Sequence, residues 1–166
     1  MKPADIDWNN FENAVYEVAV QCLNFLDSNP PNGAIYSIGV EGMIEEGVIS
    51  IGANTEQFRN SDSQWWMPDW TLRHLDECLD IDPITTIFQP LAQNIAAIDY
   101  EKHPIETFEE LTRFFRLGCL KAIKRIEVEA QNFTFKKTSD FSLMYMDSAD
   151  AFYLGTSIDE GIKILS

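Results

Sequence analysis

The stretch AIYSIGVEGMIEEGVISIG, residues 34–52, decides the fold class of this chain. Positions 36, 38 and 40 are large and apolar while 37 and 39 are small, which is the two-residue period of a strand that buries one face. Glu45-Glu46-Gly47 supplies a turn, and a second apolar run follows at 48–52. The stretch therefore predicts an antiparallel β-hairpin.

Two long amphipathic helices are predicted, one before and one after this hairpin. In the first, apolar residues recur with the 3–4 spacing of one helix face, and Asn29-Pro30-Pro31 ends it. These apolar residues are Trp8, Phe11, Val15, Val18, Cys22 and Phe25. In the second, Thr107 and Glu110 fit a capping box, and an apolar stripe follows from Phe108 to Ile126.

Shorter helices are expected between the hairpin and the second long helix. Asn54, with Gln57 three residues later, fits the N-cap of a short helix. Asp69 is the candidate cap of a helix through residues 70–79, and Pro83 is the candidate first residue of one that reaches 98.

The tail returns to strands. Large and smaller side chains alternate through 141–146, and Asp147-Ser148-Ala149-Asp150 is a turn signal, so residues 151–154 are predicted to pair back as a second hairpin. Ser157 with Glu160 predicts a capped helical turn. The chain is thus expected to form one α+β domain, residues 1–166, with a mostly antiparallel sheet of two hairpins packed against two long amphipathic helices.

The composition is that of a globular protein. The chain has 166 residues, of which 45% are hydrophobic and 12% aromatic, enough to bury a core without covalent cross-links. No apolar run reaches the length of a membrane-spanning helix, and the first residues have no apolar signal region, so a cytoplasmic location is expected. Cys22, Cys78 and Cys119 lack the short spacing of a metal or redox motif and are expected to be reduced.

The charge is large and uneven. The formal net charge is −15, from 27 acids and 12 bases. Residues 1–110 hold 20 acids and 4 bases, whereas residues 111–166 hold 7 acids and 8 bases. A surface this negative repels nucleic acid and anionic lipid, so neither a nucleic acid nor a membrane is an expected partner.

Catalytic and metal-binding signatures are missing from the sequence. No glycine-rich phosphate loop and no serine in a nucleophile elbow is present. His74 and Cys78 are four residues apart with Asp76, Asp80 and Asp82 nearby, but this mixed set lacks a second histidine or cysteine pair. We therefore expect no metal, no cofactor and no catalytic residue, and we interpret the protein as a binder and not an enzyme.

The tryptophans offer the most specific binding signal. Trp65, Trp66 and Trp70 are crowded together, either as part of the core or as an aromatic anchor patch rimmed by acids, which is the composition of a protein-binding hot spot. Adjacent Trp65 and Trp66 cannot point the same way in regular structure. The candidate partner-binding residues are Glu45, Glu46, Trp65, Trp66, Trp70, Asp76, Glu77, Asp80 and Asp82.

One resemblance bears on function. The stretch Gly47 to Phe58, with Ala53-Asn54-Thr55-Glu56 after a strand, followed by Trp66-Met67-Pro68-Asp69-Trp70, resembles a family of small bacterial proteins of unknown function. Members of that family resemble proteins encoded near polymorphic toxin systems, which implies an immunity protein. The resemblance carries over no catalytic residue.

These observations lead to one hypothesis and two alternatives. The first is an acidic immunity-type inhibitor that occludes a basic, nuclease-like toxin domain through electrostatic attraction. The second is an enzyme with an unfamiliar acidic or metal-assisted site. The third is a structural or oligomerisation module, in which the basic face of residues 113–125 contacts the acidic surface of a second copy. The oligomeric state is left open.

Overall fold

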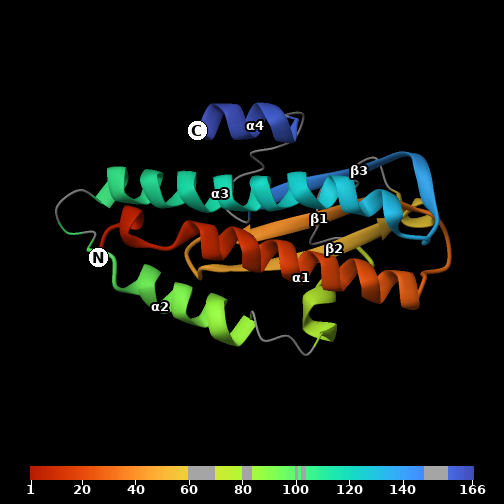
Figure 1. The fold of residues 1–166 in the computed structure, drawn as a ribbon, viewed down its shortest axis with the longest axis horizontal. Helices are drawn as coiled ribbons and strands as arrows, with labels where there is room; N and C mark the ends of the chain where they lie inside the picture. Colours follow the sequence, from red (N-terminus) through yellow and green to blue (C-terminus); the bar gives the residue numbers. More distant parts are fainter. Residues whose placement is uncertain (60–69, 80–83, 100, 102–103, 148–156) are drawn as a thin grey trace.

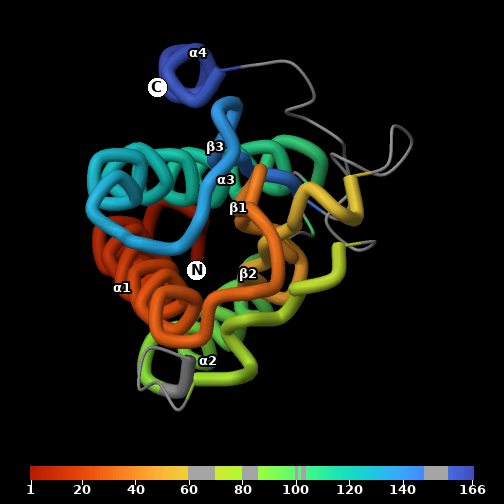
Figure 2. Tube along the Cα trace, turned by 90° about the vertical axis from the view of Figure 1, so that its right-hand side faces the viewer, coloured from red at the N-terminus to blue at the C-terminus, as the bar shows by residue number. Residues whose placement is uncertain are grey.

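A computed structural model of the chain describes residues 1–59, 70–79, 84–99, 101, 104–147 and 157–166. A three-stranded sheet forms one layer, and helices α1 (Trp8–Ser28) and α3 (Pro104–Glu129) lie side by side across one of its faces (Figures 1 and 2). The shorter helix α2 (Gln89–Ala96) and the C-terminal helix α4 (Ile158–Leu165) lie on opposite sides of this pair (Figure 2). The α+β class is confirmed.

The two long helices follow the apolar stripes in the sequence. Asp7 caps α1 because its carboxylate accepts a hydrogen bond from the Asn10 amide at 3.0 Å, and α1 ends at Ser28, before the paired prolines. The start of α3 was predicted wrongly, since the helix begins at Pro104 and Thr107 lies inside it. Proline suits the first turn of a helix, where its missing N–H has no partner to lose.

The sheet is mixed and not mostly antiparallel. Strands β1 (Ile35–Met43) and β2 (Val48–Thr55) form the predicted hairpin. Strand β3 (Lys137–Asp147) pairs with the other side of β1 in parallel, which gives the order β2-β1-β3. β3 therefore joins the sheet through its parallel pairing with β1. The return strand expected at 151–154 lies outside the described residues.

Two glycines let the long helices approach each other and the sheet. A Cβ added to Gly118 of α3 would lie 2.7 Å from the ring of Phe11 on α1. A Cβ added to Gly42 of β1 would lie 2.8 Å from the ring of Phe115 on α3. The rings of Phe11 and Phe115 are fully buried with centroids 4.7 Å apart, so they form the centre of the core.

The segment that follows the hairpin differs from the prediction. Asn54 is not a helix cap but a buried residue of β2, and its side-chain amide donates to the Tyr36 hydroxyl at 3.1 Å. A short 3-10 turn, η2 (Glu56–Phe58), follows β2. Residues 70–79 form no long helix. They hold one 3-10 turn, η4 (Leu75–Cys78), and pair with the outer edge of β2 where the Ala53 amide donates to the Leu72 carbonyl at 2.8 Å.

The remaining short elements agree better with the sequence. A π-helical turn, η5 (Ile84–Phe88), leads into α2, which has Pro90 in its first turn. A helical segment is therefore present where one was expected, while its candidate first residue, Pro83, lies outside the described residues. Helix α4 begins with the predicted capping box of Ser157 and Glu160. The 3-10 turns η1 (Pro3–Asp5) and η6 (Ala130–Asn132) precede α1 and follow α3.

The three cysteines are free thiols, as expected. Cys22 on α1 and Cys119 on α3 are buried, and burial raises the pKa of both thiols. They therefore act as small apolar core residues. Among the described helices, none combines the length and the apolar composition that crossing a bilayer requires.

A buried ion pair fixes the end of β3 to α3. The Arg116 Nε atom lies 2.6 Å from Asp147 Oδ2, and the Asp147 side chain is only 1% exposed. Because Arg116→Met removes a cation that faces a buried carboxylate, we expect it to lower the free energy of unfolding by about 3–5 kcal/mol, measured by urea denaturation.

Lys121→Met provides the control, since Lys121 is an exposed residue of the same helix, and we expect a change within about 0.5 kcal/mol. The double variant Arg116→Met/Asp147→Leu should recover most of the loss. If Arg116→Met were no worse than Lys121→Met, the ion pair would not be what anchors β3.

Candidate functional site

The candidate partner-binding residues occupy different environments. Glu45 and Glu46 are exposed in the turn between β1 and β2, and Glu77 is exposed on η4. Trp70 is buried, 3% exposed, and packs its ring edge-to-face on Tyr36 with centroids 6.3 Å apart. Asp76 is also buried, 8% exposed. The other four candidates, Trp65, Trp66, Asp80 and Asp82, lie outside the described residues.

Exposed carboxylates gather at one end of the molecule, which we call the acidic end. Four segments meet there: the N-terminus, the β1–β2 turn, the chain after α2 and the first turns of α3 (Figure 1). The Asp99 amide is 3.5 Å from the Met1 carbonyl, and Gly47 approaches Ala92 of α2. The acids of these segments are Asp5, Asp7, Glu45, Glu46, Asp99, Glu101, Glu106, Glu109 and Glu110.

Among the described residues, few bases accompany the acids of the acidic end. Lys2 and Arg113 are the bases that the described residues place in these segments. Within the described part of the chain, seven of the nine carboxylates make neither an ion pair nor a helix-capping contact; Asp5 and Asp7 hold backbone amides instead. Glu106 also lies in the first turn of α3, where the helix dipole favours negative charge. Neighbouring like charges thus remain exposed to solvent at this end.

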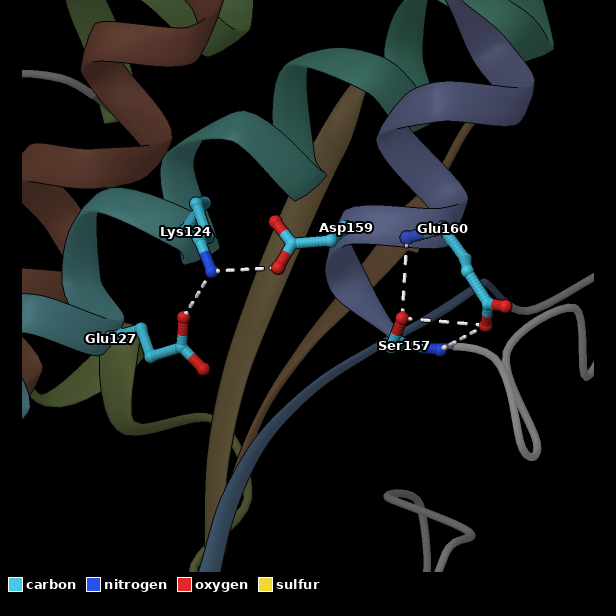
Figure 3. Close-up of polar contacts among 5 residues, drawn as sticks. All are labelled: Lys124, Glu127, Ser157, Asp159 and Glu160. Atoms are coloured by element: carbon cyan, nitrogen blue, oxygen red, sulfur yellow. Dashed lines mark hydrogen bonds and ion pairs between the residues drawn. The ribbon is translucent and has the colours of Figure 1, made fainter.

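The opposite half of α3 is neutralised by internal ion pairs. The Lys124 ammonium lies 2.8 Å from Glu127 and 3.0 Å from Asp159 of α4, so it bridges two carboxylates (Figure 3). Arg125 contacts Glu12 of α1 at 3.1 Å. These contacts tie α3 to both neighbouring helices.

The basic face expected for residues 113–125 is therefore weaker than its sequence indicates. Arg116, Lys124 and Arg125 are all ion-paired within the chain. Lys121 is exposed without an ion pair among the described residues, and the Arg113 guanidinium lies over the Phe114 ring at 4.6 Å. An oligomer held by this face against a second copy would thus have few cations to offer.

A second cluster lies where residues 70–79 meet the outer edge of β2. Ser50 of β2 is the register partner of Glu41 of β1, so their side chains share one face of the sheet. The Ser50 Oγ is 3.0 Å from His74 Nδ1 and 3.0 Å from Asp76 Oδ1. Asp76 Oδ1 also accepts a hydrogen bond from the Ile51 amide at 2.7 Å. His74 has φ of 57°, the left-handed region, where histidine occurs more readily than most residues.

Hydrogen-bond accounting defines the chemistry of this cluster. Ser50 has one hydroxyl hydrogen, and the Asp76 carboxylate can only accept, so the serine donates to Asp76. His74 Nδ1 must then donate to the serine oxygen, which leaves Nε2 as the available ring nitrogen. The serine is 1% exposed and lies between the other two groups. In a hydrolytic triad the histidine is central, so the arrangement here positions an imidazole and does not activate a nucleophile.

Glu41 and Ser50 were not predicted as members of a cluster, because the cluster depends on where residues 70–79 cross the edge of β2. Within the cluster, only His74 and Asp76 are near each other in the sequence. They are two residues apart, a spacing that does not place side chains on one face of a helix. No group of three or more metal-ligating side chains is present among the described residues. His74 and Cys78, which are four residues apart, do not share a helix, since His74 precedes the short 3-10 turn that holds Cys78.

Comparison with protein-family models, with curated proteins and with solved structures finds no match to this chain. What the protein does must therefore be argued from its own residues.

The carboxyl of Glu41, the register partner of Ser50, makes the stability of this second cluster depend on pH. Burial raises the pKa of its carboxyl, and His74 and Arg73 oppose that shift only in part. The folded state thus favours the protonated form, and its stability falls as the pH rises through the folded pKa. We expect Glu41→Gln to raise the free energy of unfolding at pH 7, and the gain to vanish below the unfolded pKa of about 4.3.

Urea denaturation between pH 4 and pH 8 would measure this difference, with Glu45→Gln in the exposed turn as the control that changes little. A loss of stability in Glu41→Gln at pH 7 would show instead that His74 and Arg73 hold the charged carboxylate more strongly than burial opposes it.

Proposed function

We propose that this protein is an acidic binding protein, an immunity-type inhibitor that occludes a basic, nuclease-like toxin domain. The observation that carries the proposal is the acidic end, where carboxylates from four chain segments converge with little internal compensation. The formal net charge of −15 gives the whole molecule the same sign.

The acidic end also offers apolar contacts. Ile105, beside Glu106 at the start of α3, is 69% exposed, and Met1 is 49% exposed. Large apolar side chains within a charged rim are the composition of protein-binding surfaces, in which short-range contacts hold the partner and the rim excludes water. A basic protein surface is therefore a better fit than a small cation.

Such a surface increases the rate of association with a positively charged partner. Nuclease domains carry positive charge where they bind the phosphate backbone. A negative surface accelerates encounter with that region toward roughly 10⁸–10⁹ M⁻¹s⁻¹ at low salt, and it competes directly with nucleic acid for the same cations. An inhibitor benefits because it must bind before the toxin reaches its substrate.

The observations revise the list of contacting residues. Glu45 and Glu46 stay candidates because they are exposed at the acidic end. Trp70 and Asp76 contact the protein's own strands, so we assign them to the fold. Ile105, Glu106 and Glu109 take their place as candidates.

Salt and charge changes test the proposal. The partner to use is the product of the neighbouring gene, co-expressed and purified with this chain. We expect the association rate, followed by stopped-flow fluorescence, to fall at least tenfold between about 10 mM and 150 mM salt, over which range screening shortens the Debye length from about 30 Å to 8 Å. The double variant Glu45→Gln/Glu46→Gln should slow association further.

Glu17→Lys is the matched control, because it makes the same change of two charges on the exposed side of α1, away from the acidic end. Its effect on the rate should be clearly smaller. A neighbouring gene product that is neither toxic nor bound would sink the proposal, and so would binding that is indifferent to salt.

A further inference from the structure

A cavity of about 240 Å³ lies between α1, the β1–β2 hairpin, η4 and the junction of η5 with α2. The elements η4 and α2 lie on the side of α1 that faces away from α3 (Figures 1 and 2). Val18, Ile49 and Phe88 belong to the hydrophobic core, so the fold itself fixes these walls of the cavity. The lining residues are Val18, Met43, Val48, Ile49, Asp76, Glu77, Phe88 and Gln89.

The lining is apolar apart from three side chains. Glu77 and Gln89 are exposed, so they mark the side on which the cavity opens to solvent. Asp76 differs from them because it is only 8% exposed and is part of a wall that is otherwise apolar. A molecule that enters the cavity therefore meets one buried acid within an apolar surface.

The fold uses one oxygen of Asp76. Oδ1 accepts hydrogen bonds from the Ile51 amide at 2.7 Å and from the Ser50 hydroxyl at 3.0 Å. The other oxygen, Oδ2, has no hydrogen-bond partner among the described residues, and no cation of the described chain pairs with this carboxylate. A buried carboxylate is costly without a compensating charge, so a ligand that supplies a cation here removes that cost.

We infer that this cavity binds a small organic ammonium ion, with the Asp76 carboxylate as its counter-ion and the apolar walls around its hydrocarbon part. The ligand is distinct from the protein partner proposed for the acidic end. The inference therefore stands or falls independently of whether that partner is a toxin.

The chemistry of Asp76 favours an ammonium group over other ligand classes. An anion would be repelled, and a wholly apolar molecule would leave the buried carboxylate without a partner. A hard metal ion requires several oxygen ligands, whereas Asp76 offers one. A guanidinium binds best through both oxygens of a carboxylate, and Oδ1 already accepts two hydrogen bonds. An ammonium is a compact charge, so a single oxygen suffices to bind it.

The volume limits the size of the ligand. An apolar cavity of about 150 Å³ holds benzene, and pockets for drug-sized molecules begin at about 300 Å³. At about 240 Å³, this cavity accommodates one aromatic ring or a short chain together with the ammonium group. Phenethylamine, a phenyl ring with an ethylammonium arm, is a probe of that size.

A titration followed by nuclear magnetic resonance tests the site with phenethylamine and its neutral isostere, phenethyl alcohol. At millimolar concentration the amine should produce saturable shifts of the amide signals of Ile49, Ile51 and Glu77. It should bind at least about tenfold more tightly than the alcohol, because a hydrogen bond between charged groups is stronger than one to a neutral hydroxyl. Equal affinity for the two probes, or the absence of a saturable shift, would overturn the inference.

Asp76→Asn separates the counter-ion from the fold. The asparagine carbonyl can still accept from Ile51 and Ser50, whereas its amide nitrogen cannot accept from an ammonium. We expect this variant to bind phenethylamine at least about tenfold more weakly, and phenethyl alcohol as the natural chain does. Glu17→Gln removes one charge from the exposed side of α1, outside the lining, and should leave both affinities unchanged. Full affinity of Asp76→Asn for the amine contradicts the assignment.

A pair of variants on α2 locates the binding without altering the buried acid. Gln89 lines the cavity, and Gln93 is an exposed residue one turn later, outside the lining. Gln89→Trp should weaken binding of phenethylamine at least about tenfold because the indole occupies the opening, while Gln93→Trp leaves it unchanged. If both variants bind the amine as the natural chain does, the amine binds elsewhere and the inference is wrong.

Discussion

The contact between Phe11 and Phe115 is the constraint on which the rest of the structure depends. The two rings meet where α1, α3 and β1 converge, and they fit only because Gly118 and Gly42 have no side chains. Burial of an aromatic ring contributes about 1.5–3 kcal/mol, and these two rings are fully buried. The close approach then sets how the helix pair lies on the sheet. Every surface feature of the molecule takes its position from that arrangement.

A sheet of three strands has two edges, and the fold treats them differently. Along β2, residues 70–79 occupy the edge: the Leu72 carbonyl accepts from Ala53 and the Asp76 carboxylate accepts from Ile51. The Asp76 carboxylate thus accepts the backbone hydrogen bond that a carbonyl of a neighbouring strand would otherwise accept. Beside β3, the last turns of α3 and the start of α4 line a cleft of about 440 Å³. Open edges invite pairing with other chains, so natural proteins cover them, as residues 70–79 cover the edge of β2.

The elements that sequence predicted are those with local signals. The stripe from Trp8 to Phe25 predicts α1, the alternation around Glu45-Glu46-Gly47 predicts the hairpin, and Ser157 with Glu160 predicts the cap of α4. Each signal lies within one element or between neighbours in the chain.

The features that sequence missed are long-range. The parallel pairing of Ile38 with Leu143 joins residues about a hundred positions apart, and nothing in either segment indicates the direction of the partner strand. Asn54 has the residue type of a cap, but burial beside Tyr36 overrides that preference. Of the candidate site, the exposure of Glu45 and Glu46 followed from their turn. The inward positions of Trp70 and Asp76 could not be predicted, because both depend on where residues 70–79 meet β2.

The bases of the second half of the chain form ion pairs where secondary-structure elements meet. Arg116, Lys124 and Arg125 each hold α3 to another element, so they neutralise carboxylates where the elements meet. Many of the acids that have no such function lie at the acidic end. Their field extends roughly 8–10 Å at physiological salt, and it attracts any cationic surface alike. Charge alone therefore cannot select one partner. Selectivity has to come from groups that act at contact distance. Among the described residues of this end, Ile105 and Met1 are exposed apolar groups of this kind, whose surfaces only a complementary partner can cover.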